Sequence, residues 1–188
     1  MSYTALIRTY NSEKTLRETL HSLEAQSLPP ADFVFVDSGS TDNTPSLLPK
    51  NSTLVRYGYK KFNYSLSLNQ GISHVRNKYT LIVSSHTTLR NPRAIQYAVD
   101  LLDAEPRVGA AYFIQEESET CSHELIGRGN FTGSNGIWNT CSIVRTSLLK
   151  KRGFRPEVFS AEDQEWTRWL IDSEGAYVAR ISGGRVRS

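Results

Sequence analysis

Polar side chains that can bind a ligand are concentrated in three short segments. They are Thr9-Tyr10-Asn11, the loop from Asp37 to Asp42, and Ser84-Ser85-His86. Each segment follows a short apolar run, so each is expected just after a strand. Hydroxyl, amide and carboxylate groups there can hydrogen-bond a ribose or a base, and Gly39 allows a tight backbone turn beside a ligand. Ordinary turns use the same residue types, so no single segment identifies the ligand.

Two adjacent carboxylates, Glu162 and Asp163, begin a helical pattern further along the chain. A carboxylate can remove the proton of an attacking hydroxyl group. Acidic residues also favour the first helical turn because they interact well with the helix dipole. Taken alone, the pair is explained by that helix preference.

The elements that must position these residues alternate between apolar runs and helical periodicity, which is typical of an α/β fold. Residues 116–139 are polar and glycine-rich and are expected to be irregular, and residues 183–188 are expected to fray. The remaining expected elements are strands at 5–7, 33–36, 54–57, 79–83 and 108–114, and helices at 13–26, 68–75, 93–104, 142–152 and 163–172. Ligands bind at the carboxyl edge of such sheets, and all three polar segments fall on that edge.

Composition narrows the class of protein. The chain has 188 residues, of which 38% are hydrophobic and 22% charged, and this suits one soluble globular domain. The net charge of +3 is spread along the sequence, so nucleic acid is not an expected partner. We find neither a signal peptide nor an apolar stretch of about 20 residues that could span a bilayer. We therefore expect a cytoplasmic protein without a transmembrane segment; peripheral association with the inner membrane face and homo-oligomerisation stay open.

Four stretches, taken in order, resemble the family 2 glycosyltransferases over nearly the whole chain. They are Arg8 to Asn11, Phe35 to Asp42, Leu68 to Ile72 leading into Tyr79 to His86, and Ala161 to Glu165. The resemblance implies a GT-A fold, with a Rossmann-like, mostly parallel central sheet flanked by helices. It implies a single domain over residues 1–188, with a nucleotide-sugar-binding half at 1–90 and an acceptor and catalytic half at 91–188.

The same resemblance implies an inverting hexosyl- or deoxyhexosyltransferase of polysaccharide biosynthesis. Its co-substrate is a nucleoside diphosphate sugar, and its acceptor is a glycan, a lipid-linked molecule or a small molecule. Asp163 matches the general base, with Glu162 beside it, and Trp138 and Asn139 are expected at the acceptor. The expected donor contacts are Thr9, Asn11, Asp37, Ser38, Asn69, Ser85 and His86.

One segment departs from the family pattern. Ser84-Ser85-His86 stands where an Asp-x-Asp motif usually holds Mg²⁺ or Mn²⁺, and such hard cations prefer carboxylate oxygens. Two roles stay open for His86: it can ligate Mn²⁺, or it can hydrogen-bond the β-phosphate without metal. Arg8, Lys60, Lys61 and Arg90 are candidates for bringing positive charge to the diphosphate. The departure also supports an alternative, a degenerate GT-A domain that binds nucleotide sugar or glycan without transfer.

Overall fold

A central sheet of eight strands forms the middle layer of the molecule. The computed structural model describes residues 2–115, 120–184 and 186–187. The strand order is β3-β2-β1-β4-β8-β6-β9-β7. Their bounds are β1 (Tyr3–Thr9), β2 (Asp32–Asp37), β3 (Thr53–Arg56), β4 (Tyr79–Ser84), β6 (Val108–Phe113), β7 (Ser122–Ile126), β8 (Cys141–Arg145) and β9 (Tyr177–Ser182). Strands β3, β2, β1 and β4 are parallel neighbours, as are β6 and β9, whereas β8 runs antiparallel to both β4 and β6. The expected α/β fold with a mostly parallel sheet is confirmed.

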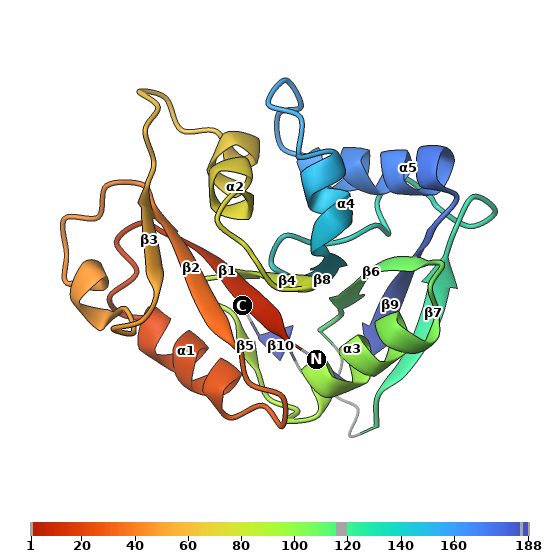
Figure 1. Ribbon diagram of the computed structural model, residues 1–188, viewed down its shortest axis with the longest axis horizontal. Coiled ribbons are helices and arrows are strands. Elements are labelled where there is room, and N and C mark those ends of the chain that lie inside the picture. Colours follow the sequence, from red (N-terminus) through yellow and green to blue (C-terminus); the bar gives the residue numbers. More distant parts are fainter. Residues whose placement is uncertain (1, 116–119, 185, 188) are drawn as a thin grey trace.

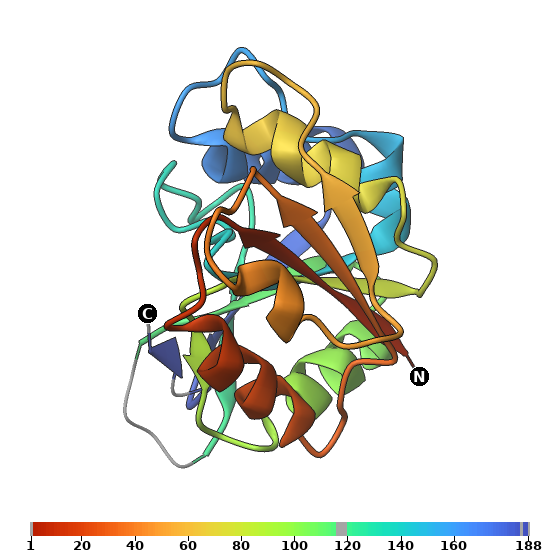
Figure 2. The same cartoon turned by 90° about the vertical axis from the view of Figure 1, so that its left-hand side faces the viewer.

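Helices cover both faces of this sheet (Figures 1 and 2). One face packs against α1 (Leu16–Glu24) and α3 (Ala94–Ala104), and the short 3₁₀ helix η1 (Thr44–Leu47) adds Leu47 to that core. The other face packs against α2 (Tyr64–Ile72), α4 (Thr146–Lys151) and α5 (Glu162–Glu174). Alternate residues of β1 serve the two cores, since Ile7 faces the first and Leu6 the second. Arg8, two residues after Leu6, therefore lies on the face covered by α2 and α5.

The register of the parallel strands brings the polar segments together. Thr9 at the end of β1 is paired with Asp37 at the end of β2, and Arg8 is paired with Ser84 at the end of β4. The carboxyl ends of the three strands therefore lie side by side, as the sequence pattern predicts.

Two expectations about the second half of the chain are wrong. Residues 142–152 do not form one helix: β8 ends at Arg145 and α4 begins at Thr146. Ile143 and Val144 are β-branched and fully buried between β4 and β6, so sheet pairing outweighs helical spacing. Part of the expected irregular segment forms β7, an edge strand on β9, while residues 116–119 lie outside the described part.

The expected fraying of the last residues is also wrong where the structure describes them. Residues 186–187 form β10 (Val186–Arg187), which pairs antiparallel with β5 (Thr88–Leu89) in a separate two-stranded sheet. Residues 185 and 188 lie outside the described range.

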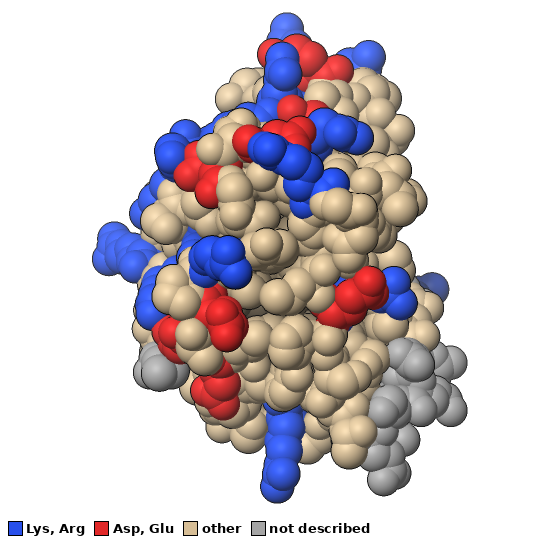
Figure 3. All heavy atoms as spheres, turned by 90° about the vertical axis from the view of Figure 1, so that its right-hand side faces the viewer, with Lys and Arg blue, Asp and Glu red and all other residues tan. Residues whose placement is uncertain are grey.

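Two further features concern the molecular surface and the helices. On the face that Figure 3 shows, basic and acidic side chains lie interspersed, in keeping with a small net charge spread along the chain. None of the helices in the described residues has the length and hydrophobicity that a membrane crossing requires.

Candidate functional site

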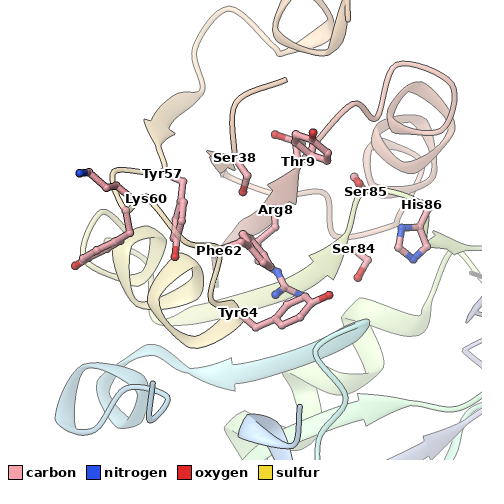
Figure 4. Close-up of a pocket in the computed structure, with 12 residues that line it drawn as sticks. Arg8, Thr9, Ser38, Tyr57, Lys60, Phe62, Tyr64, Ser84, Ser85 and His86 are labelled. Carbon is pink, nitrogen blue, oxygen red and sulfur yellow. The ribbon is translucent and has the colours of Figure 1, made fainter. Parts of the chain in front are cut away.

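A pocket of about 620 Å³ opens at the carboxyl ends of β1, β2 and β4. Four of the predicted donor residues line it: Thr9, Ser38, Ser85 and His86. Figure 4 shows how they lie around Arg8. The other lining residues are Tyr10, Tyr57, Tyr59, Lys60, Phe62, Tyr64 and Ser84.

The Asp37 carboxylate organises one wall of this pocket. It is 3% exposed, and it accepts hydrogen bonds from Thr9 Oγ1 (3.0 Å), Gly39 N (3.1 Å), Ser40 N (3.0 Å) and Ser40 Oγ (2.6 Å). Burial raises the pKa of Asp37, but these hydrogen bonds outweigh burial and the net pKa lies below its usual value. Gly39 has a φ of 94°, which a residue with a side chain rarely adopts. Asp37 is thus held as an ionised acceptor that shapes the loop.

Asn11 and Asp42 fix the same loop from the other side. Asn11 Oδ1 accepts from Thr41 N at 2.8 Å, and Asn11 itself has a positive φ of 47°. Asp42 accepts from Glu13 N at 3.1 Å and from Thr44 N at 2.9 Å, so its carboxylate orders the loop. The exposed Asn11 stands at the rim, and its contact with a donor stays a prediction.

The segment Ser84-Ser85-His86 does not form a divalent-cation site with its neighbours. Ser85 Oγ lies 2.8 Å from Ser12 Oγ, and His86 is an exposed imidazole. Among the described residues, no group of three or more His, Cys, Asp or Glu side chains is placed to hold a metal ion. The Asp37 carboxylate, at the end of β2, is engaged in its own loop. The residues present therefore do not fit Mg²⁺ or Mn²⁺.

An aromatic wall, defined here as Tyr57, Tyr59, Phe62 and Tyr64, completes the pocket opposite His86. Ring centroids lie 5.5 Å apart for Tyr57 and Phe62 and 4.8 Å apart for Phe62 and Tyr64. Tyr59, Phe62 and Tyr64 are between 42% and 52% exposed, although aromatic rings favour burial. Our sequence reasoning missed this wall. The signal was present, since four aromatic residues occur within eight positions of a polar connection.

The Glu162–Asp163 pair begins α5, and Asn139 holds both carboxylates. Asn139 Nδ2 donates to Glu162 Oε1 at 3.1 Å, and Asn139 N donates to Asp163 Oδ2 at 3.4 Å. Burial raises the pKa of Asp163, and the neighbouring Glu162 carboxylate raises it further, against hydrogen bonds from Asn139 and Gln164. A carboxylate with a raised pKa is a better general base near neutral pH.

The loop that carries Asn139 also reaches the pocket at the ends of β1, β2 and β4. Ser84 N donates to Thr140 O at 3.0 Å, one residue beyond Asn139. Gln164 fixes the start of α5 to the same loop, because it accepts from Gly136 N and donates to Ile137 O. The acidic pair and the end of β4 are therefore tied to one segment.

Trp138 lies on a second pocket of about 520 Å³ with Tyr112, Asn135 and Arg180. The Trp138 side chain is 37% exposed, and its ring centroid lies 5.3 Å from that of Tyr112. By contrast, Trp166 is fully buried in the core. A partly exposed indole of this kind can pack against the apolar face of a sugar ring.

Asn69 lies away from the other predicted donor residues. Its amide donates to Phe154 O at 2.7 Å and accepts from Phe154 N at 2.9 Å, so both polar ends are used. It lines a separate pocket with Ile72 and Gly153. This position does not support the expected donor contact; Asn69 instead joins α2 to the turn after α4.

Comparison with known proteins points to one family. Residues 4–153 match the family described as Glycosyl transferase family 2. The chain is 27% identical over 163 residues to an uncharacterised glycosyltransferase of Rickettsia typhi, covering 78% of this chain and 51% of that protein. It is 27% identical over 195 residues to the poly(ribitol-phosphate) β-N-acetylglucosaminyltransferase TarS of Staphylococcus aureus, covering 89% and 32%. This chain thus spans between 32% and 51% of the length of these relatives.

Two solved structures of glycosyltransferases have a similar fold. Residues 1–349 of S. aureus TarS superpose with a TM-score of 0.73 at 23% identity, covering 96% of this chain and 58% of that one. The mannosyltransferase PcManGT of Pyrobaculum calidifontis, solved with GDP-Man and Mn²⁺, gives a TM-score of 0.74 at 21% identity, covering 97% and 56%. At these identities the likeness concerns the fold, which is the expected GT-A fold.

Proposed function

This chain belongs to glycosyl transferase family 2, and we propose that it transfers a hexosyl or deoxyhexosyl group from a nucleoside diphosphate sugar with inversion at the anomeric carbon. The observation that carries the proposal is the meeting of the donor pocket and the acidic pair on one loop. Ser84 at the pocket binds that loop through Thr140, and Asp163 binds it through Asn139.

The pocket at the ends of β1, β2 and β4 is proposed to receive the donor. Ser38, Ser85 and His86 offer polar groups at its surface, and the aromatic wall offers ring faces to a base. Thr9 and Asp37 are proposed to support the donor site indirectly. Their side chains hydrogen-bond each other, and Asp37 holds the loop that would contact the nucleotide. Asn11 supports that loop at the rim. In this proposal residues 1–90 form the donor half and residues 91–188 the acceptor half.

Asp163 is proposed as the general base. It would take the proton of the acceptor hydroxyl while that oxygen attacks the anomeric carbon from the face opposite the diphosphate, as the base of an inverting glycosidase activates water. Glu162 is 7% exposed, and its charge raises the pKa of Asp163. Glu162 therefore acts as a positioning and tuning residue.

The acceptor is proposed to lie along Trp138, with a glycan, a lipid-linked molecule or a small molecule as candidates. Trp138 offers a partly exposed indole, whereas Asn139 is 6% exposed and bound to Glu162. Asn139 therefore serves the acceptor site by fixing the acidic pair beneath it.

A second candidate function is a domain that binds nucleotide sugars without transferring them. The observation that favours it is the poor metal-binding chemistry of Ser84-Ser85-His86. Both candidates share the donor pocket and differ only in whether the glycosidic bond is broken.

A panel assay separates the two. The purified chain is incubated with uridine, guanosine and thymidine diphosphate sugars and with glycan acceptors, and both nucleoside diphosphate release and glycosylated product are measured. Transfer from at least one donor is the expected result. Binding without turnover, seen as stabilisation against heat that grows with donor concentration, supports the second candidate instead. If the chain shows no binding and no turnover with any donor tested, both candidate functions are contradicted.

A further inference from the structure

Arg8 brings a positively charged side chain into the proposed donor pocket. Its side chain lines the pocket, and the guanidinium carbon lies 4.8 Å from the centre of the Tyr64 ring (Figure 4). In the described residues its Nη1 atom is buried and has no hydrogen-bond partner. A buried guanidinium N–H without an acceptor costs free energy, so it indicates a place for an acceptor that the chain itself does not supply.

The surroundings of the Arg8 guanidinium affect its pKa and hold it in place. Burial lowers the pKa of Arg8 below its usual value, although the charges of Glu162, Tyr64 and Asp163 act in the opposite direction. An arginine stays protonated in proteins, so the pocket holds a permanent cation. Stacking on the Tyr64 ring orients the guanidinium plane, and the β1–β4 register places Arg8 beside Ser84.

Arg8 lies beside the segment that stands in place of the metal-binding motif, because it is paired with Ser84 in the sheet. This segment lacks the carboxylate ligands that a divalent cation prefers. Ser84-Ser85-His86 brings one imidazole and two hydroxyls, and Asp37 is engaged in its own loop. A cation bound there would also lie near the Arg8 charge, which disfavours it further. A guanidinium, in contrast, matches phosphate oxygens with two parallel N–H donors.

We propose that Arg8 takes the role of the divalent cation, so that this site binds and stabilises the departing nucleoside diphosphate without metal. The inference rests on the proposed function. In the transfer step the acceptor oxygen forms a bond to the anomeric carbon while the bond from that carbon to the β-phosphate oxygen breaks. The proton passes to Asp163, and the electron pair stays on the diphosphate, whose new negative charge Arg8 pairs.

Arg8 could instead serve only to balance the charge of the acidic pair. The two roles predict different effects of Arg8 on the affinities for nucleoside diphosphates and monophosphates. Contact with the β-phosphate makes Arg8 matter for a nucleoside diphosphate and much less for the matching monophosphate. Charge balance alone would change the affinity for both nucleotides by the same factor.

Calorimetry with UDP, GDP and dTDP, and with their monophosphates, tests the proposal. Each titration is run once in EDTA and once with Mn²⁺, on wild type, Arg8→Gln, Arg8→Lys and the control Arg17→Gln. Arg17 is an exposed residue of α1, on the opposite face of the sheet. Thermal unfolding establishes that each variant is folded.

Wild type is expected to bind at least one of the three nucleoside diphosphates, with the same affinity in EDTA and in Mn²⁺. Arg8→Gln is expected to lose about 10- to 100-fold of that affinity while its affinity for the monophosphate changes less than about threefold. Arg8→Lys should keep part of the binding, and Arg17→Gln all of it.

Binding that requires Mn²⁺ overturns the proposal while the proposed function stands. Equal losses for diphosphate and monophosphate in Arg8→Gln also overturn it. If Arg8→Gln does not fold, the wild-type comparison between EDTA and Mn²⁺ still decides. If wild type binds none of these nucleotides under either condition, the proposed function fails, and this inference fails with it.

Discussion

The polar side chains at the sheet edge divide into those that shape the pocket and those that face it. Asp37 and Asn11 belong to the first group, because their oxygens accept hydrogen bonds from the loop at 38–41. Ser38, Ser85 and His86 line the cavity itself. At this scale the residue type predicts the place in the fold but does not separate a loop support from a ligand contact.

Asp37 should make stability depend on pH. Its net pKa is lowered in the folded protein, so its ionised form stabilises the fold above the unfolded pKa of about 3.9 and that contribution is lost as the pH falls through the lower folded pKa. Asp37→Asn is expected to lower the free energy of unfolding at pH 7 by about 1–3 kcal/mol. Urea denaturation is measured between about pH 7 and about pH 2.5, a range that spans the titration of ordinary carboxyl groups. The difference in unfolding free energy between Asp37→Asn and wild type should become smaller in acid.

The control for this experiment is Asp100→Asn, which changes an exposed carboxylate of α3. It is expected to differ little from wild type at either pH. A gap for Asp37→Asn that stays constant down to the acid limit would show that the carboxylate charge does not carry the loop's stability.

Asn69 and Arg8 show what the sequence pattern leaves undecided, whereas Thr9 and Ser85 show what it predicts. Thr9 is the last residue of β1 and Ser85 follows the last residue of β4, so the strand ends place them at the edge, as expected. Asn69 lies within α2, and only the packing of α2 against the turn at 153–154 decides that its amide binds backbone. Arg8 was one of several basic candidates, because sequence position alone does not indicate which side chain has a buried N–H group without a partner among the described residues.

At the scale of elements, α2 determines how closely the aromatic wall approaches the sheet. A Cβ atom at Gly71 would lie 2.3 Å from Leu6 Cδ1 and 2.8 Å from Val36 Cγ2, so α2 packs almost directly on β1 and β2. Tyr64 begins this helix and stacks on Arg8, so displacement of α2 moves the ring away from the guanidinium.

Gly71→Ala is therefore expected to destabilise the protein by about 1–3 kcal/mol through overpacking, although alanine is the better helix former. The matched control is Gly129→Ala, where an added Cβ meets no atom within 4 Å. Chemical denaturation of both variants measures the difference. Equal stability of Gly71→Ala and wild type would contradict the close packing of α2 on the sheet.

Elements of the first half were predictable, whereas several of the second half were not. Buried parallel strands such as β2 and β4 are continuous apolar runs that end at polar loops. The helix expected at 142–152 failed because β8 takes its conformation from partners that are distant in sequence, on β4 and β6. The edge strand β7 is mostly exposed and polar, so it lacks the apolar signal of a strand.

At the scale of the whole molecule, the antiparallel strand β8 joins the proposed donor half to the rest of the proposed acceptor half. It lies between β4, which ends at Ser84, and β6, which is followed in the sheet by β9. The loop just before β8 carries Trp138 and Asn139, so the strand order itself brings the proposed acceptor residues to the end of β4. This arrangement follows from long-range pairing, which a local sequence pattern does not contain.

The most direct test of the account is the transfer rate of Asp163→Asn, compared with wild type and with Asp172→Asn from the exposed part of the same helix. Asparagine keeps the size of the side chain and cannot take the acceptor proton. We predict a rate about 10²- to 10⁴-fold lower for Asp163→Asn with unchanged donor affinity, and a wild-type rate for Asp172→Asn. Equal transfer rates for Asp163→Asn and wild type would contradict the assignment of Asp163 as the base and with it the proposed mechanism.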